Sequence, residues 1–149
     1  MEIVLYQPEI AGNVGAIIRL SANTGIPLHI IEPAGIVFNS SKMKRAGLDY
    51  HDIAIVTNHN NWNIFKKEQT STSSLIATTK SNNIYWKKDL TKTDYIIFGS
   101  ESVGLPNKVL NQFKQQSITI PMDSESRSIN LANSVAIISY EYLRQMETK

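Results

Sequence analysis

Short apolar runs, separated by amphipathic or polar stretches, recur along the whole chain. Each run is apolar along its length, as strands that are covered on both faces tend to be. This alternation favours an α/β fold, a mostly parallel sheet of about six strands with helices on both faces, over a sandwich or a helical bundle. The predicted strands are residues 3–6, 28–31, 53–56, 75–78, 95–98 and 117–120.

Two helices are predicted from the spacing of apolar residues. The first covers residues 13–24 and should end at Gly25, which favours a left-handed C′ position and is followed by Pro27. The second lies in the C-terminal region, where Leu131, Val135 and Ile138 would fall on one face of a helix. Shorter helices are expected over residues 41–46, 61–68 and 107–115.

Length and composition narrow the class of protein. A chain of 149 residues fits a single domain, 1–149, and its 42% apolar and 19% charged residues are ordinary for a globular fold. The absence of cysteine excludes disulfides, thiolate nucleophiles and iron–sulfur clusters, and the three histidines show no spacing typical of a metal site. With no apolar window long enough for a membrane span and no basic leader, we expect a cytoplasmic protein without bound metal.

Three polar segments follow or adjoin predicted strands, at the edge where open α/β sheets bind ligands. They are residues 8–19, 98–106 and 120–134. The first leads from strand into helix and carries two glycines and Arg19. In the second, Glu101 could either cap the next helix or meet a ligand. The third runs into the last helix with Asn130 and Asn133 one turn apart.

These segments, in this order, closely resemble the motifs of the SPOUT methyltransferases, and within them the minimal TrmL-like tRNA (cytidine/uridine-2′-O-)methyltransferases. The resemblance also includes residues 22–25, 28–33 and 45–51 and the pair Tyr140-Glu141, so it covers nearly the whole chain. It implies a C-terminal deep trefoil knot, a homodimer, S-adenosyl-L-methionine as cofactor, and the wobble nucleotide (position 34) in the anticodon stem-loop of a tRNA as the site of 2′-O-methylation.

Carried over by position, the resemblance also assigns residues. Arg19 and Tyr140 would be catalytic, Arg19 by gripping a phosphate and stabilising a developing alkoxide, because a guanidinium is effectively never deprotonated. The cofactor would lie among Ala77, Thr78, Gly99, Glu101, Ile120, Met122, Ser128 and Leu131. RNA-binding residues would be Asn13, Lys42, Lys44, Arg45, Arg127, Asn130 and Asn133.

Two positions depart from the family pattern, and other functions stay open. Ala16 stands where relatives commonly carry Asn, and Val103 where a polar or basic residue is common. The alternatives are methylation of another tRNA or rRNA ribose, a catalytically silent RNA-binding protein on the same fold, and a flavodoxin-like nucleotide-binding module. The apolar faces of the first and last helices are candidates for a dimer interface, although they could equally form the core of one chain.

Overall fold

The computed structural model describes residues 1–35, 55–69, 73–113 and 115–148. Within these ranges six strands form one parallel sheet in the order β3-β2-β1-β5-β4-β6. The strands are β1 (Glu2–Tyr6), β2 (Leu28–Ile31), β3 (Val56–His59), β4 (Ser74–Ala77), β5 (Tyr95–Phe98) and β6 (Ser117–Ile118). The predicted α/β class and parallel sheet are therefore confirmed.

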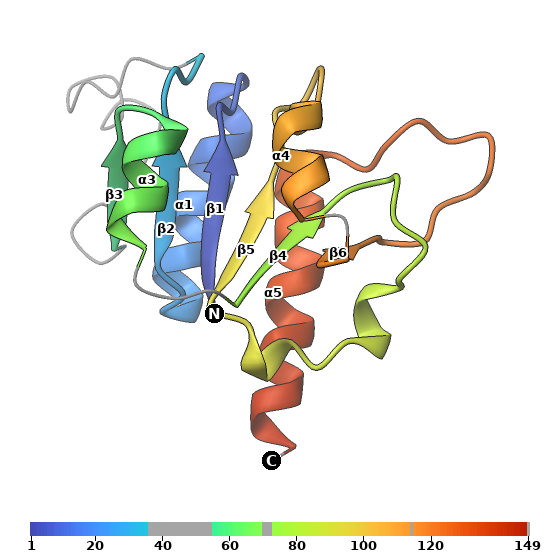
Figure 1. Cartoon of the computed structure of the whole chain (residues 1–149). Coiled ribbons are helices and arrows are strands. Elements are labelled where there is room, and N and C mark those ends of the chain that lie inside the picture. Colours follow the sequence, from blue (N-terminus) through green and yellow to red (C-terminus); the bar gives the residue numbers. More distant parts are fainter. Residues whose placement is uncertain (36–54, 70–72, 114, 149) are drawn as a thin grey trace.

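Helices cover both faces of the sheet (Figure 1). They are α1 (Ala11–Thr24), α3 (Trp62–Glu68), α4 (Asn107–Gln112) and α5 (Leu131–Glu147), with the 3₁₀ turns η1 (Tyr85–Lys87) and η2 (Leu90–Lys92) between β4 and β5. Because successive side chains of a strand point to opposite faces, β1 supplies both cores. Leu5 packs in the core that includes α1 and α5, and Val4 packs in the one that includes α3 and α4.

The apolar stripes of α1 and α5 are part of the core of this chain. Ile17, Ile18 and Val135 are fully buried beside the sheet. As predicted, α1 ends at Gly25, whose φ of 70° is left-handed and whose backbone N–H donates to the Ser21 carbonyl. α5 is the longest described helix at 17 residues, and no described helix combines the length and apolar character of a membrane span.

The third strand differs from its prediction. It covers Val56–His59 instead of residues 53–56, because β2 pairs in register with Val56 to His59. Ile55 precedes the strand and is exposed. Residues 53 and 54, and the helix predicted over 41–46, lie outside the described ranges.

The polar end of β3 is explained by a chain of hydrogen bonds across the sheet. His59 Nε2 lies 2.9 Å from His29 Nδ1, His29 Nε2 lies 2.5 Å from Glu2, and His59 Nδ1 lies 2.8 Å from Glu68. His59 is also stacked on His29 and packed edge-on against Phe65. Both ring nitrogens of the buried His59 therefore have partners, as buried polar groups generally do.

The C-terminal strand is short because its extension pairs with a loop. The predicted strand over 117–120 ends at Ile118, and Thr119 instead forms a parallel bridge with Ile84. The Thr119 N–H donates to the Asn83 carbonyl at 2.8 Å, and the Tyr85 N–H donates to the Thr119 carbonyl at 3.0 Å. Similarly, the helix predicted over 107–115 ends at Gln112.

Candidate active site

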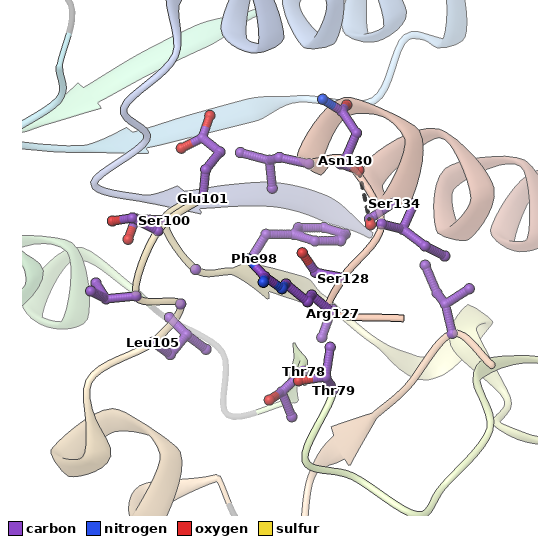
Figure 2. A pocket seen from close by; sticks show the side chains of 18 of the residues that line it. Thr78, Thr79, Phe98, Ser100, Glu101, Leu105, Arg127, Ser128, Asn130 and Ser134 are labelled. Carbon is purple, nitrogen blue, oxygen red and sulfur yellow. Dashed lines mark hydrogen bonds between the residues drawn. The ribbon is translucent and has the colours of Figure 1, made fainter. Parts of the chain in front are cut away.

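A cavity of about 600 Å³ opens at the carboxyl edge of the sheet, next to the ends of β4 and β5. Its walls come from residues 77–80, 98–105, 119–122 and 127–134, with Ile10 and Asn13 at one side. Figure 2 shows side chains from these segments turned toward a common space, with Phe98, Thr78 and Ser128 around it. Stretches that are far apart in sequence thus form one site.

The turn after β5 brings the chain back very close to itself. A Cβ on Gly99 would lie 2.3 Å from the Gly104 carbonyl carbon and 2.4 Å from the Leu105 nitrogen, so only glycine fits there. Gly104 itself has a left-handed φ of 70°, and its N–H donates to the Ser100 carbonyl at 3.0 Å. The buried Ser100 Oγ lines the cavity and has no hydrogen-bond partner within the described residues.

The Glu101 carboxylate is held by donors from the segment after β1. It accepts from the backbone N–H of Glu9 at 2.7 Å, from that of Ile10 at 3.2 Å and from Asn13 Nδ2 at 2.8 Å. Desolvation by burial raises the pKa of Glu101, but these hydrogen bonds, from Asn13 first and then from the backbone, together lower the pKa below its ordinary value. Glu101 is therefore a fixed anion at neutral pH.

Asn13 joins Glu101 to the third segment. While its amide nitrogen donates to Glu101, its Oδ1 accepts from Asn130 Nδ2 at 2.9 Å. Asn130 is also the N-cap of α5, since its Oδ1 accepts from the Asn133 N–H at 3.3 Å. The start of α1, the turn after β5 and the start of α5 are consequently linked by one run of side chains.

A second carboxylate, that of Glu9, links the same two loops, and here the donors lie in the turn after β5. Glu9 accepts from the Ser102 N–H at 3.2 Å and from Ser102 Oγ at 2.6 Å, while the Glu9 N–H donates to Glu101. Glu9 and Glu101 thus each accept a hydrogen bond from the backbone of the loop that carries the other.

The predicted residues fall into three groups. All eight predicted cofactor positions line the cavity, as do Asn13, Arg127 and Asn130. The exposed residues Arg19 on α1, Tyr140 on α5 and Asn133 do not line it. Lys42, Lys44 and Arg45 lie outside the described ranges.

Several lining or supporting residues were not singled out from the sequence. Phe98 and Leu105 add apolar side chains to the lining, and Ser134 and Lys80 add polar ones. Glu9 stabilises the turn after β5 by accepting a hydrogen bond from Ser102. Two signals were available: Lys80 is the second residue after the predicted fourth strand, and Glu9 stands in the polar segment after the first strand. Val103 is 81% exposed at the rim, where an apolar side chain has no packing role.

The residues suit a medium-sized ligand with a planar apolar part and a polar end. The volume lies within the range for small-molecule sites, and apolar side chains such as Leu105, Ile120 and Leu131 share the lining with polar ones. Thr78 and Ser128 in the lining add hydroxyl groups that can hydrogen-bond such a ligand. Among the described side chains, no group of three or more His, Asp or Glu is placed to hold a metal ion.

Comparison with known proteins places the chain in a family. Residues 1–140 match the SpoU rRNA Methylase family, and the chain belongs to that family. Among individual relatives, it is 43% identical over 147 residues to the tRNA (cytidine(34)-2′-O)-methyltransferase of Escherichia coli K12, covering 98% of this chain and 94% of that one.

Solved structures agree with the sequence comparison. A protein from Bacillus anthracis superimposes with a TM-score of 0.94 at 36% identity, over 98% of this chain and 94% of that chain. A protein solved in work on the 2-OH methylation of C/U34 on tRNA superimposes with a TM-score of 0.89 at 36% identity, over 99% of this chain and 97% of that chain.

Proposed function

We propose that this protein transfers a methyl group from S-adenosyl-L-methionine to the ribose 2′ oxygen of the wobble nucleotide, a cytidine or modified uridine, of tRNA. The observation that carries the proposal is the single cavity into which residues 77–80, 98–105 and 119–134 converge. The near full-length match to a tRNA (cytidine(34)-2′-O)-methyltransferase supports the choice of nucleotide.

The lining residues have distinct parts in holding the cofactor. We assign the apolar Ile120, Met122 and Leu131 to the flanks of the adenine, and Ala77, Thr78 and Gly99 to its edges through backbone groups. The cofactor supplies a methyl group on a positively charged sulfur, which an oxygen nucleophile can displace. Glu101 is a fixed anion at this cavity, so it favours a cationic ligand there.

The reaction needs the 2′ oxygen to be aligned and its developing charge to be balanced. An oxygen–carbon bond forms, the carbon–sulfur bond breaks, and the hydroxyl proton leaves to a phosphate oxygen or water. Arg19 keeps its own proton and acts by gripping a phosphate and stabilising the alkoxide. Holding the two reactants in line is worth up to about 7–11 kcal/mol of the barrier in favourable cases.

The position of Arg19 and Tyr140 supports a homodimer. Both are exposed on helices α1 and α5 and neither lines the cavity of its own chain. Tyr140 is 59% exposed, so its ring is open to contact by a second copy. We propose that a second copy packs on these helices, so that Arg19 and Tyr140 of one subunit complete the site of the other.

Arg127 at the cavity is assigned to the RNA together with Asn13, Asn130 and Asn133, and the basic group Lys42, Lys44 and Arg45 is assigned to the anticodon stem-loop. We also propose the trefoil knot; the pairing of Thr119 with residues 83–85 holds the segment before α5 against the loop between β4 and β5, a contact that threading through that loop would require. A tRNA substrate supports the expected cytoplasmic location.

Mass spectrometry of digested tRNA after incubation with isotopically labelled cofactor tests the proposal. Wild type should give a labelled 2′-O-methylated nucleoside at position 34, and Arg19→Ala should abolish it. Lys67→Ala is the control, because Lys67 is an exposed cation on α3, which packs in the other core, away from α1 and α5. Label in rRNA or at another tRNA position would support the alternative ribose, and no label in any RNA would refute the enzyme.

The dimer has its own test. A mixed dimer of Arg19→Ala with a cofactor-site variant, Gly99→Val, should have one working site of its two, about half the activity of a wild-type dimer, if the two subunits share sites, although each homodimer is inactive. Recovery of no activity in the mixture would refute shared sites and leave Arg19 acting within its own chain.

A further inference from the structure

The segment from Lys80 to Lys88 presents an exposed aromatic ring between exposed lysines. Trp86 is 49% exposed, although tryptophan is usually well covered, and Lys80, Lys87 and Lys88 are exposed around it in the sequence. In Figure 1 this yellow-green segment runs outside the sheet, between β4 and β5. We call it the Trp86 segment.

The Trp86 segment is held firmly in place. The Tyr85 N–H donates to the Thr119 carbonyl, and the Lys88 N–H donates to the Tyr85 carbonyl. Tyr85 packs on the main core and meets Trp86 edge-on, with ring centroids 5.0 Å apart. The indole therefore projects from an anchored turn, so a ligand that binds there would not have to order it.

The segment meets the cavity at its start and again, indirectly, at Tyr85. Lys80 lines the cavity directly, and Tyr85 pairs with Thr119, which also lines it. A ligand that reaches into the cavity can therefore continue along this segment.

The charges of the segment point to an anionic ligand. Lys80, Lys87 and Lys88 form no ion pair within the described residues, whereas the neighbouring Asp89 is engaged by Thr91 at 2.6 Å and by Lys92 at 3.6 Å. A ring with cations on both sides is the combination that binds single-stranded nucleic acid, the ring by stacking on a base and the cations by contacting phosphates.

We infer that the Trp86 segment is a binding surface for unpaired RNA: Trp86 stacks on a base of the substrate, and Lys80, Lys87 and Lys88 contact its phosphates. The inference rests on the proposed function, because it extends the RNA from the cavity along the segment. The surface is sequence-tolerant, since every base offers a face for stacking.

Tryptophan fluorescence gives a direct test. The chain has two tryptophans, so Trp62→Phe leaves Trp86 as the only one. In that variant, adding an RNA hairpin with an unpaired loop should quench the emission, and a blunt RNA duplex of equal length should not. Emission that changes with protein concentration instead, and not with RNA, would mean that a second copy covers Trp86 and would overturn the inference.

Affinity measurements provide an independent test in the unmodified background. Trp86→Ala should weaken hairpin binding by about 5- to 150-fold, whereas Trp86→Phe should retain most of the affinity. The double variant Lys87→Gln/Lys88→Gln should reduce the slope of log affinity against log salt concentration by up to about 1.4. Binding of S-adenosyl-L-methionine, measured by calorimetry, should be unchanged in all of them.

The two proposals fail separately. If wild type methylates tRNA and Trp86→Ala binds RNA as tightly as wild type, the segment is not an RNA surface and the enzyme assignment stands. If no ribose is methylated but Trp86→Ala and the lysine variant weaken RNA binding, the surface stands and the enzyme assignment fails.

Discussion

Replacing Gly99 by alanine tests whether the turn after β5 shapes the cofactor site. The added Cβ would lie 2.3 Å from the Gly104 carbonyl carbon and 2.4 Å from the Leu105 nitrogen, about 1 Å short of ordinary contact. Both neighbours are backbone atoms, so no side chain can rotate away. The turn itself must open.

The magnitude follows from the cost of forcing extra volume into packed structure, typically about 1–3 kcal/mol. We expect Gly99→Ala to lose that much free energy of unfolding. If the cofactor binds only the closed turn, its affinity should fall by a comparable free energy, about 5- to 150-fold. The natural control is Gly12→Ala, since a Cβ on Gly12 has no atom within 4 Å and α1 gains a better helix former.

Urea unfolding and calorimetry with S-adenosyl-L-methionine measure the two effects. Gly12→Ala should leave the free energy of unfolding unchanged or raise it by up to about 1 kcal/mol, with unchanged affinity. If Gly99→Ala matched wild type in both stability and affinity, the turn would not be the wall of the cofactor site and our account of the cavity would be wrong.

Three further predictions follow from buried or paired groups. Because Asn13 and Asn130 share a hydrogen bond, urea unfolding of Asn13→Ala, Asn130→Ala and the double variant should give a coupling energy of about 0.5–3 kcal/mol, and strict additivity would contradict the link. The pKa of Glu101 is lowered in the folded protein, so its contribution to stability is present above its ordinary pKa near 4.5 and is lost as pH falls through the lower folded pKa. The difference in free energy of unfolding between wild type and Glu101→Gln should therefore shrink below about pH 4.5. A difference that does not depend on pH would refute this. Phe65, on α3, is 1% exposed and packs in the core with Val4, so Phe65→Ala should cost about 3–5 kcal/mol in urea unfolding, and a loss under 1 kcal/mol would show that this core is not closely packed.

Much of the fold could be predicted because its strands are apolar on both faces. The runs near residues 3–6 and 95–98 matched β1 and β5 within a residue, since central strands such as these bury consecutive side chains on both faces. β3 was misplaced because the edge strand takes polar residues, Thr57 and Asn58, that no apolar count would select. His59 fits that strand only through His29 and Glu68, partners that adjacent sequence does not reveal.

The candidate site was predicted where a motif marked it and missed where a long-range contact made it. Gly99 and Ser128 stand in segments that follow strands, so strand order alone brings them to one edge. The part played by Glu9 depends on Ser102, which is 93 residues away, and spacing carries no information about such a pair. For Arg19 and Tyr140 the reverse holds: the resemblance to the family assigned them a catalytic role, but within one chain neither residue lines the cavity.

The link from Asn13 through Glu101 to Asn130 has a consequence for synthesis on the ribosome. Of the segments that line the cavity, residues 127–134 are translated last. A nascent chain that has already formed β1, β4 and β5 therefore still lacks one side of the cavity. Any ligand of the finished cavity will favour the completed chain over shorter intermediates by mass action. Cellular cofactor can therefore help to drive the late docking of α5, in addition to its use in the reaction.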